Sequence, residues 1–208
     1  MAAEVSRRAA RREGLEEYVG RRDTAPAVRA SAHVSTSGTV ELVSPVPADG
    51  AVIHALVRDC PPLDLNSVYA YLLLCEHHAE TCVRAMRDGE TVGFVSAYRI
   101  PQRPEVLFVW QVAVAPVMRG SGLARRMLNR LLARDAVREC RYIETTVSPS
   151  NLPSRRLFES LAREHDTALA ESVLFSESAF GPASHEAEVL FRIGPLHPSN
   201  RRYLNHES

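Results

Sequence analysis

The sequence contains no lysine, because every residue in its Lys plus Arg total of 25 is an arginine. A chain without lysine cannot form a Schiff base with pyridoxal phosphate, supply the lysine of a Walker A loop or carry an acyl-lysine intermediate. The arginines are balanced by 25 acidic residues, so the formal net charge is zero. Neither nucleic acid nor an anionic membrane is therefore favoured as a partner.

Paired cysteines and long apolar runs are absent as well. The four cysteines make no C-x-x-C pattern and each lies among aliphatic residues, which predicts buried small hydrophobes rather than nucleophiles or metal ligands. No apolar run is long enough for a signal sequence or a membrane span. We therefore expect a cytoplasmic protein.

The length of 208 residues suits one ordinary domain. Residues 1–38 are rich in Ala, Arg, Ser and Thr and hold few large apolar side chains, which predicts a flexible tail. We expect one domain over 39–196 and a short C-terminal tail over 197–208.

Apolar periodicity within this domain predicts alternating strands and helices. The run 106–114 is nearly continuous in β-branched and aromatic residues and suits a central strand. The other expected strands are 40–43, 81–86, 91–98, 141–147, 172–175 and 188–193, and the expected helices are 52–57, 68–77, 122–134 and 151–164. This order predicts an α/β (mixed α+β) fold, with a mixed sheet and helices on both of its faces.

A glycine-containing turn joins the central strand to the helix that follows it. In Arg119-Gly-Ser-Gly-Leu-Ala124, Gly120 and Gly122 let the backbone approach a ligand closely, and the hydroxyl of Ser121 adds a donor. Successive N–H groups and the helix dipole make an anion site that suits a pyrophosphate, although an ordinary strand-to-helix turn has the same composition.

This turn resembles the Arg/Gln-x-x-Gly-x-Gly/Ala signature of the Gcn5-related N-acetyltransferases (GNAT), and Asn151-x-x-Ser154-x-x-Leu157-Phe158 resembles their second motif. The resemblance implies the GNAT fold, with a mostly antiparallel sheet whose two central strands splay apart around acetyl-CoA. It places the cosubstrate against Val112, Ala113, Val114, Arg119, Gly120, Ser121, Gly122, Leu123, Ala124, Asn151, Ser154 and Phe158. A backbone N–H near Val112 would stabilise the oxyanion.

Phe158 departs from the tyrosine that usually protonates the leaving thiolate in this family. Another tyrosine such as Tyr69 or a water could serve instead. A thiol pKa of about 8.5 also makes departure of an unprotonated thiolate tolerable.

Five further segments resemble the L-2,4-diaminobutyrate acetyltransferases of ectoine synthesis: 63–72, 91–96, 107–114, 143–151 and 185–195. This resemblance implies transfer of acetyl to the 4-amino group of L-2,4-diaminobutyrate by a homodimer. Two alternatives stay open, which are acetylation of another small diamine or amino acid and a non-catalytic acyl-CoA-binding regulator.

A substrate with two ammonium groups and a carboxylate needs acidic partners. In the resembling family the loop of Asp64 lines the substrate site, which favours an ammonium contact over a solvated helix-terminal acid. Asn66 and Tyr69 follow on the same turn and could complete the pocket, with capping of the helix as the alternative for Asn66. Trp110 could offer a ring face to a cation or form a pocket wall, although strand aromatics usually belong to the core.

Glu144, Thr146, Tyr69 and His185 complete the candidate substrate and catalytic residues. Glu144 and Thr146 alternate along one strand and point to the same face. A carboxylate in a largely buried strand needs a partner, which makes Glu144 a candidate for amine binding or proton removal unless it lies at an exposed edge. His185 is well suited to accept a proton near neutral pH, and we discount a metal because the His185-x-x-Glu pattern has no third ligand.

Overall fold

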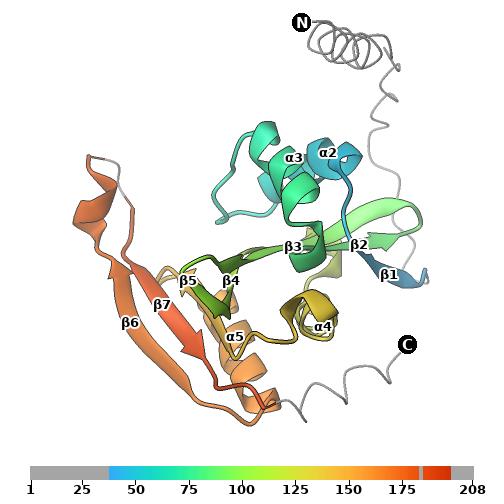
Figure 1. The fold of residues 1–208 in the computed structure, drawn as a ribbon. Helices are drawn as coiled ribbons and strands as arrows, with labels where there is room; N and C mark the ends of the chain where they lie inside the picture. The colour runs from blue at the N-terminus through green and yellow to red at the C-terminus, as the bar shows by residue number, and fades with distance from the viewer. Residues whose placement is uncertain (1–37, 183–184, 198–208) are drawn as a thin grey trace, which may run out of the picture. The chain divides into compact units, whose positions relative to one another are not determined.

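The computed structural model describes residues 38–182 and 185–197. Apart from Gly38 and His197, the tails expected at 1–38 and 197–208 lie outside the described residues. The described chain forms one seven-stranded sheet in the order β1-β2-β3-β4-β5-β7-β6 (Figure 1). Its strands are β1 (Val40–Val43), β2 (Val83–Arg87), β3 (Glu90–Ile100), β4 (Arg103–Val114), β5 (Tyr142–Val147), β6 (Leu169–Phe175) and β7 (Glu188–Ile193).

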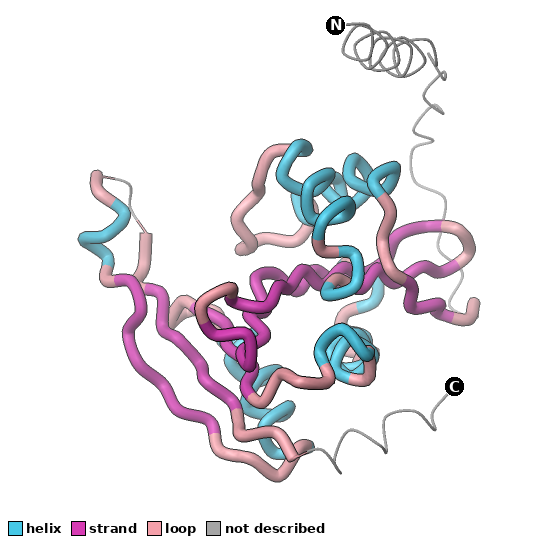
Figure 2. Tube along the Cα trace, in the orientation of Figure 1, coloured by secondary structure: helices cyan, strands magenta, loops and turns pink. Residues whose placement is uncertain are grey.

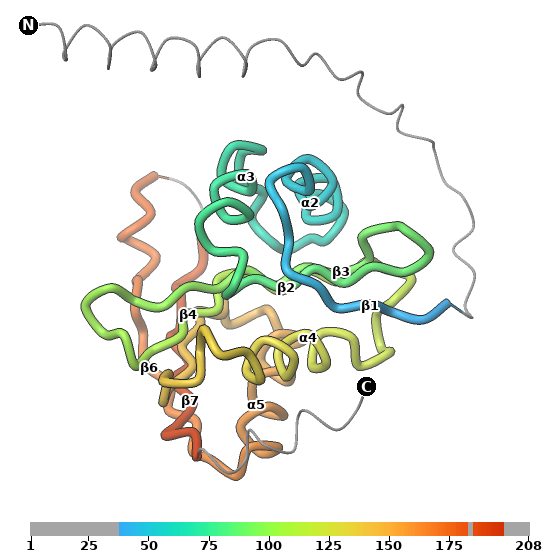
Figure 3. Tube along the Cα trace, turned by 45° about the vertical axis from the view of Figure 1, so that its right-hand side comes forward, coloured from blue at the N-terminus to red at the C-terminus, as the bar shows by residue number. Residues whose placement is uncertain are grey.

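Helices cover both faces of the sheet, as the order of the elements predicted. The helices α2 (Gly50–Arg58) and α3 (Val68–His77) lie on one side of the sheet, and α4 (Leu123–Leu132) and α5 (Leu152–Glu164) on the other (Figures 1 and 3). Two clusters of buried residues result, one under α2 and α3 around Tyr71 and Phe94, and a larger one around Met127, Leu131 and Leu161.

Each predicted strand and helix is present, with shifts of a few residues at its ends. Helix α3 runs over the predicted range because the Ser67 hydroxyl accepts the N–H of Ala70 and caps it. Asn151 caps α5 in the same way, since its side-chain oxygen accepts the N–H of Ser154 at 3.2 Å. All four cysteines are buried and free, which confirms their expected role as small hydrophobes.

The two central strands diverge. Strands β4 and β5 run parallel and pair only from Val106 with Tyr142 to Phe108 with Glu144, whereas every other strand pair in the sheet is antiparallel. Beyond Phe108, β4 continues to Val114 without a partner strand on that side. The expected splayed, mostly antiparallel sheet is thus confirmed.

Strands β6 and β7 form a long pair at one end of the sheet, at the left in Figure 2. Strand β6 is the edge and has mostly exposed residues, while β7 pairs on its other side with β5. The first residues of β7 therefore come close to the loop between β5 and α5. Across the described ranges, no helix is long and apolar enough to cross a membrane.

Candidate active site

A cleft of about 850 Å³ lies where β4 and β5 separate. We call it the glycine-loop cleft. It brings together nine of the predicted cosubstrate residues: Val112, Val114, Arg119, Gly120, Gly122, Leu123, Ala124, Asn151 and Ser154. Arg125 and Arg156, which the sequence motifs had not indicated, also line it and add positive charge.

The glycines of this cleft hold a backbone conformation that other residues rarely adopt. Gly120 has φ +77° and Gly122 has φ +78°, and a Cβ atom added at either position would point into open space. Gly122 directly precedes α4, whose N-terminus has no side-chain cap. Unpaired N–H groups and the positive end of the helix dipole thus meet at the cleft, as an anion site requires.

Three predicted cosubstrate residues do not line this cleft. Ala113 alternates with Val112 and Val114 along β4, so its fully buried side chain packs on the opposite face under α2 and α3. The hydroxyl of Ser121 donates to the carbonyl of Met118 at 2.7 Å. Phe158 is buried in the larger core cluster. These side chains have structural roles here.

A second, smaller cavity of about 340 Å³ adjoins the first. Both cavities are lined by Pro62, Leu63 and Asn151, so they meet at these residues. We call the smaller one the acidic pocket, because the carboxylates of Asp64 and Glu188 line it together with His185. Its remaining lining residues are Tyr98, Phe108, Trp110, Gln111, Thr146, Val147, Ser148, Phe175 and Phe180.

A β-bulge brings Trp110 and Gln111 to the acidic pocket. Ser96 pairs with Gln111 and Ala97 with Val109, so Trp110 is the extra residue of β4. The indole is 42% exposed, and the side chain of Gln111 is almost fully buried. The prediction that Trp110 forms a pocket wall agrees with this position.

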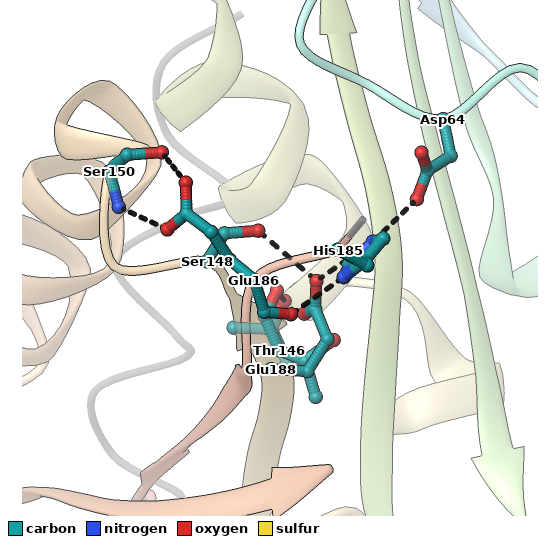
Figure 4. Close-up of polar contacts among 8 residues, drawn as sticks. Asp64, Thr146, Ser148, Ser150, His185, Glu186 and Glu188 are labelled. Atoms are coloured by element: carbon teal, nitrogen blue, oxygen red, sulfur yellow. Dashed lines mark hydrogen bonds and ion pairs between the residues drawn. The ribbon is translucent and has the colours of Figure 1, made fainter. Parts of the chain in front are cut away.

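His185 lies between the two carboxylates (Figure 4). Its Nε2 is 3.6 Å from Oδ2 of Asp64 and 3.9 Å from Oε1 of Glu188. Its ring stacks on that of Phe180, with 3.9 Å between the centroids. Asp64 and His185 were both predicted as substrate-site residues, and the structure brings them together although Asp64 precedes α3 and His185 precedes β7. Glu188, which begins β7, was not among the predicted residues.

Hydrogen bonding defines which nitrogen of His185 can accept a proton. The Nδ1 atom is 2.6 Å from the carbonyl oxygen of Glu186, which only accepts, so Nδ1 carries the hydrogen and Nε2 faces the carboxylates. This hydrogen bond to the Glu186 carbonyl raises the pKa of His185 above its usual value, and the charges of Asp64 and Glu188 add to the effect. Nε2 is the basic atom of the pocket.

Two serines fix the chain that carries His185 and Glu188. Glu186 accepts both the N–H and the hydroxyl of Ser150, at 3.0 and 2.5 Å, which lowers the pKa of its carboxyl group. The Ser148 hydroxyl donates to Glu188 at 3.1 Å. Figure 4 shows these contacts beside Thr146, which lines the pocket as predicted. The acidic pocket is thereby tied to the loop that leads into α5.

Glu144 does not face the acidic pocket. Its buried carboxylate accepts two hydrogen bonds from Arg103, at 2.7 and 2.8 Å, and one from Arg192. Both oxygens thus have cationic partners, which is how a strand carboxylate is tolerated at 1% exposure. The expectation that Glu144 binds or deprotonates an amine is not supported by these contacts.

Tyr69 and Asn66 also lie outside both cavities. Tyr69 is 67% exposed on α3, and Asn66 precedes the Ser67 cap. Neither residue lines either cavity, so the expected roles of Tyr69 in catalysis and of both residues in substrate binding find no support in the structure.

Sequence reasoning did not identify several polar residues of the acidic pocket, namely Tyr98, Gln111, Ser148 and Glu188. Glu188 is the charged one among them. Its signal was present, because His185 and Glu188 have the i, i+3 spacing that we weighed only as a metal pattern. No group of three His, Cys, Asp or Glu side chains within 38–182 and 185–197 is arranged to hold a metal ion.

The splayed sheet and the cleft at the start of α4 define the class of the protein, that of the GNAT acetyltransferases. The model of the acetyltransferase (GNAT) family matches residues 51–162. The chain is 57% identical over 152 residues to an L-2,4-diaminobutyric acid acetyltransferase of Bordetella parapertussis, which covers 72% of this chain and 82% of that protein. A Streptomyces avermitilis protein of the same name is 49% identical over 72% of this chain and 84% of its own length.

A solved structure gives the same result. The diaminobutyrate acetyltransferase EctA from Paenibacillus lautus, in complex with its substrate L-2,4-diaminobutyric acid and coenzyme A, is 45% identical with a TM-score of 0.75, over 77% of this chain and 97% of that one. The chain belongs to the family of L-2,4-diaminobutyric acid acetyltransferases.

Proposed function

We propose that the protein transfers an acetyl group from acetyl-CoA to the 4-amino group of L-2,4-diaminobutyrate, giving N4-acetyl-L-2,4-diaminobutyrate. The observation that carries this proposal is the pair of carboxylates, Asp64 and Glu188, on either side of His185 in a pocket that adjoins the glycine-loop cleft. Family membership supports the same substrate.

The acidic pocket suits a small molecule with two ammonium groups. At neutral pH the two carboxylates can pair with ammonium groups, and the ring of Trp110 can contact a cation. No arginine lines this pocket within the described chain, so neutral donors such as the hydroxyl groups of Tyr98 and Thr146 would hold the substrate carboxylate.

Proton removal is assigned to His185. An alkyl ammonium group has a pKa of about 10.4 and must lose a proton before the nitrogen can attack a carbonyl carbon. Nε2 of His185 faces the same space as Asp64 and Glu188, so an ammonium held by these carboxylates lies within reach of the base. The Glu186 carbonyl keeps the ring in the tautomer that has its lone pair on Nε2.

The glycine-loop cleft fits the cosubstrate. Unpaired N–H groups at the start of α4, with Arg119, Arg125 and Arg156, suit the phosphate groups of acetyl-CoA. The unpaired edge of β4 at Val112 and Val114 offers backbone donors and acceptors to its amide groups. When bound, acetyl-CoA supplies the thioester whose acetyl group is transferred.

Departure of the thiolate proceeds without a tyrosine donor in this proposal. Phe158 is buried, and the described residues that line the glycine-loop cleft include no tyrosine. A thiol pKa of about 8.5 allows the thiolate to leave and take its proton from water.

The biological setting is part of the same proposal. We place the enzyme in the cytoplasm, where it provides the acetylated intermediate of ectoine synthesis. We further propose that two chains form a homodimer, each with one domain over 39–196. Four free cysteines agree with a reducing compartment, and the family resemblance supports the pathway and the dimer. Light scattering after gel filtration tests the dimer.

A steady-state assay over several amines tests the function. We expect CoA release to be fastest with L-2,4-diaminobutyrate and slower with ornithine, lysine and 2,3-diaminopropionate. Equal rates with all four amines would show that the enzyme accepts diamines broadly and is not specific for diaminobutyrate. Binding of acetyl-CoA without CoA release for any amine would instead identify a non-catalytic acyl-CoA-binding regulator.

A further inference from the structure

Two buried polar side chains connect the core under α3 to the loop of Asp64. The hydroxyl of Tyr71 donates to Oε1 of Gln111 at 3.1 Å, and Nε2 of Gln111 donates to the backbone carbonyl of Asp64 at 2.6 Å. Tyr71 is fully buried, and Gln111 is 5% exposed.

The chemistry of the partners fixes the direction of both bonds. The carbonyl of Asp64 only accepts, so the NH₂ end of the Gln111 amide must face it. The amide oxygen then faces Tyr71, whose hydroxyl donates. A reversed amide would place two acceptors together at 2.6 Å, so a single orientation is stable.

The Asp64 loop has little else to hold it. Among the described residues, the backbone of Asp64, Leu65 and Asn66 makes no hydrogen bond besides the one from Gln111. The side chain of Asp64 is 82% exposed, so packing does not fix it either. Its carboxylate nevertheless lies 3.6 Å from Nε2 of His185.

Gln111 itself is held firmly. Its backbone N–H donates to the buried hydroxyl of Ser96 at 3.2 Å, beside the bulge at Trp110. The rings of His54 and Phe94 pack against Tyr71 at its other end, with centroid distances of 5.9 and 6.4 Å. One side-chain amide thus joins the buried core to the loop of Asp64.

We propose that Gln111, supported by Tyr71, is a positioning residue that sets where the carboxylate of Asp64 stands in the acidic pocket and thereby tunes recognition of the diamine. This inference rests on the proposed function, and it adds a role for two residues that need not touch the acetyl group. Because the loop position fixes the span between Asp64 and Glu188, Gln111 also limits the length of diamine that the pocket accepts.

The test uses near-isosteric, uncharged variants of the full chain. Gln111→Met removes both hydrogen bonds, and Tyr71→Phe removes only the one that orients the amide. Thr81→Val is the matched control, because it deletes another buried hydrogen bond, from Thr81 to the carbonyl of Ala97 at 2.6 Å, at a residue that lines neither cavity.

We expect Gln111→Met to raise the KM for diaminobutyrate by about tenfold, the value of one lost hydrogen bond, with the KM for acetyl-CoA unchanged. Tyr71→Phe should shift the same constant in the same direction by less, and Thr81→Val should leave it unchanged. Activity with ornithine should fall less than activity with diaminobutyrate in Gln111→Met. Equal changes in both KM values, or equal effects of Gln111→Met and Thr81→Val, would overturn the positioning role.

An NMR titration of His185 separates this inference from the proposed function. The groups facing the imidazole are the carboxylates of Asp64 and Glu188 and the carbonyl of Glu186. If Gln111→Met releases Asp64, the pKa of His185 falls towards its ordinary value in the free protein. If the pKa of His185 is the same in Gln111→Met and in the wild type, the positioning role is wrong, even when the enzyme is active. If the wild-type protein does not acetylate diaminobutyrate, the proposed function is wrong, and the titration still decides the positioning role.

Discussion

The carboxylate of Asp64 and the imidazole of His185 face each other across the acidic pocket, with 3.6 Å between Oδ2 and Nε2. Asp64 belongs to the loop before α3, and His185 precedes β7. This contact therefore joins two segments of the pocket wall that are far apart in the sequence (Figure 4). An ammonium group that enters there meets a carboxylate and a base together.

Replacing Asp64 by Asn should weaken diamine binding. The variant keeps the size of the side chain but removes the charge that pairs with an ammonium group, so we expect the KM for diaminobutyrate to rise about tenfold, as for one charge-assisted hydrogen bond. The KM for acetyl-CoA should stay the same. Asp59→Asn is the control, because Asp59 is an exposed carboxylate paired with Arg58 outside the pocket. Parallel changes in both KM values for Asp64→Asn would contradict an ammonium contact.

The pH dependence should identify His185 as the base. A histidine must be neutral to accept a proton, and the pKa of His185 is raised from its usual value of 6.5. We therefore expect kcat/KM for diaminobutyrate to increase with pH, with the midpoint of this increase above pH 6.5. Asp64→Asn removes one charge that raises this pKa and should move the midpoint to lower pH. His185→Asn should lower kcat and abolish the increase. An increase that persists in His185→Asn would assign the proton to another group.

Gly122→Ala should weaken acetyl-CoA binding. Its φ of +78° disfavours a side chain, and a Cβ atom would occupy the open space of the glycine-loop cleft. Gly89→Ala is a matched control, since Gly89 has φ +81° and open space around it but lies in the β2–β3 turn. Both variants should lose about 1 kcal/mol of stability. Isothermal titration should show weaker binding of acetyl-CoA for Gly122→Ala alone, and unchanged affinity would argue against phosphate binding at this turn.

Glu144→Gln should affect stability rather than catalysis. The change leaves Arg103 and Arg192 without their shared carboxylate, and because both arginines are partly exposed we expect a loss of about 1–3 kcal/mol in the free energy of unfolding. Urea denaturation measures this loss, while the pH profile of kcat/KM should keep its shape. If the increase of kcat/KM with pH is shifted in Glu144→Gln, Glu144 is again a candidate for the base.

Local patterns were sufficient to predict the elements of this fold. Strand β7 begins and ends at the predicted residues, Glu188 and Ile193, and α3 covers the expected range. The glycine turn was located correctly because its residues are contiguous and its backbone geometry is a property of glycine. Asn151, predicted as a cosubstrate residue, lines the glycine-loop cleft, and its role as the cap of α5 was not predicted.

Residues that depend on distant partners were harder to predict. Alternation along β5 indicated that Glu144 and Thr146 share a face, but it could not indicate that arginines from the start of β4 and from β7 would reach Glu144 first. The bulge at Trp110 has no signal in the sequence, and it decides which side chains of β4 reach the acidic pocket. The spacing of His185 and Glu188 was visible in the sequence, but the place of Glu188 in the acidic pocket follows from the pairing of β7 with β5.

The unpaired edge of β4 has a thermodynamic consequence. Beyond Phe108 the strand has no partner strand on the β5 side, so a ligand in the cleft can form hydrogen bonds with backbone groups of this edge. A ligand that pairs with this edge binds the folded chain and not the unfolded one, and mass action then adds its binding free energy to the stability of the fold. The melting temperature of the protein should therefore rise with the concentration of acetyl-CoA, because the bound cosubstrate supplies the hydrogen-bond partners that this edge of β4 lacks.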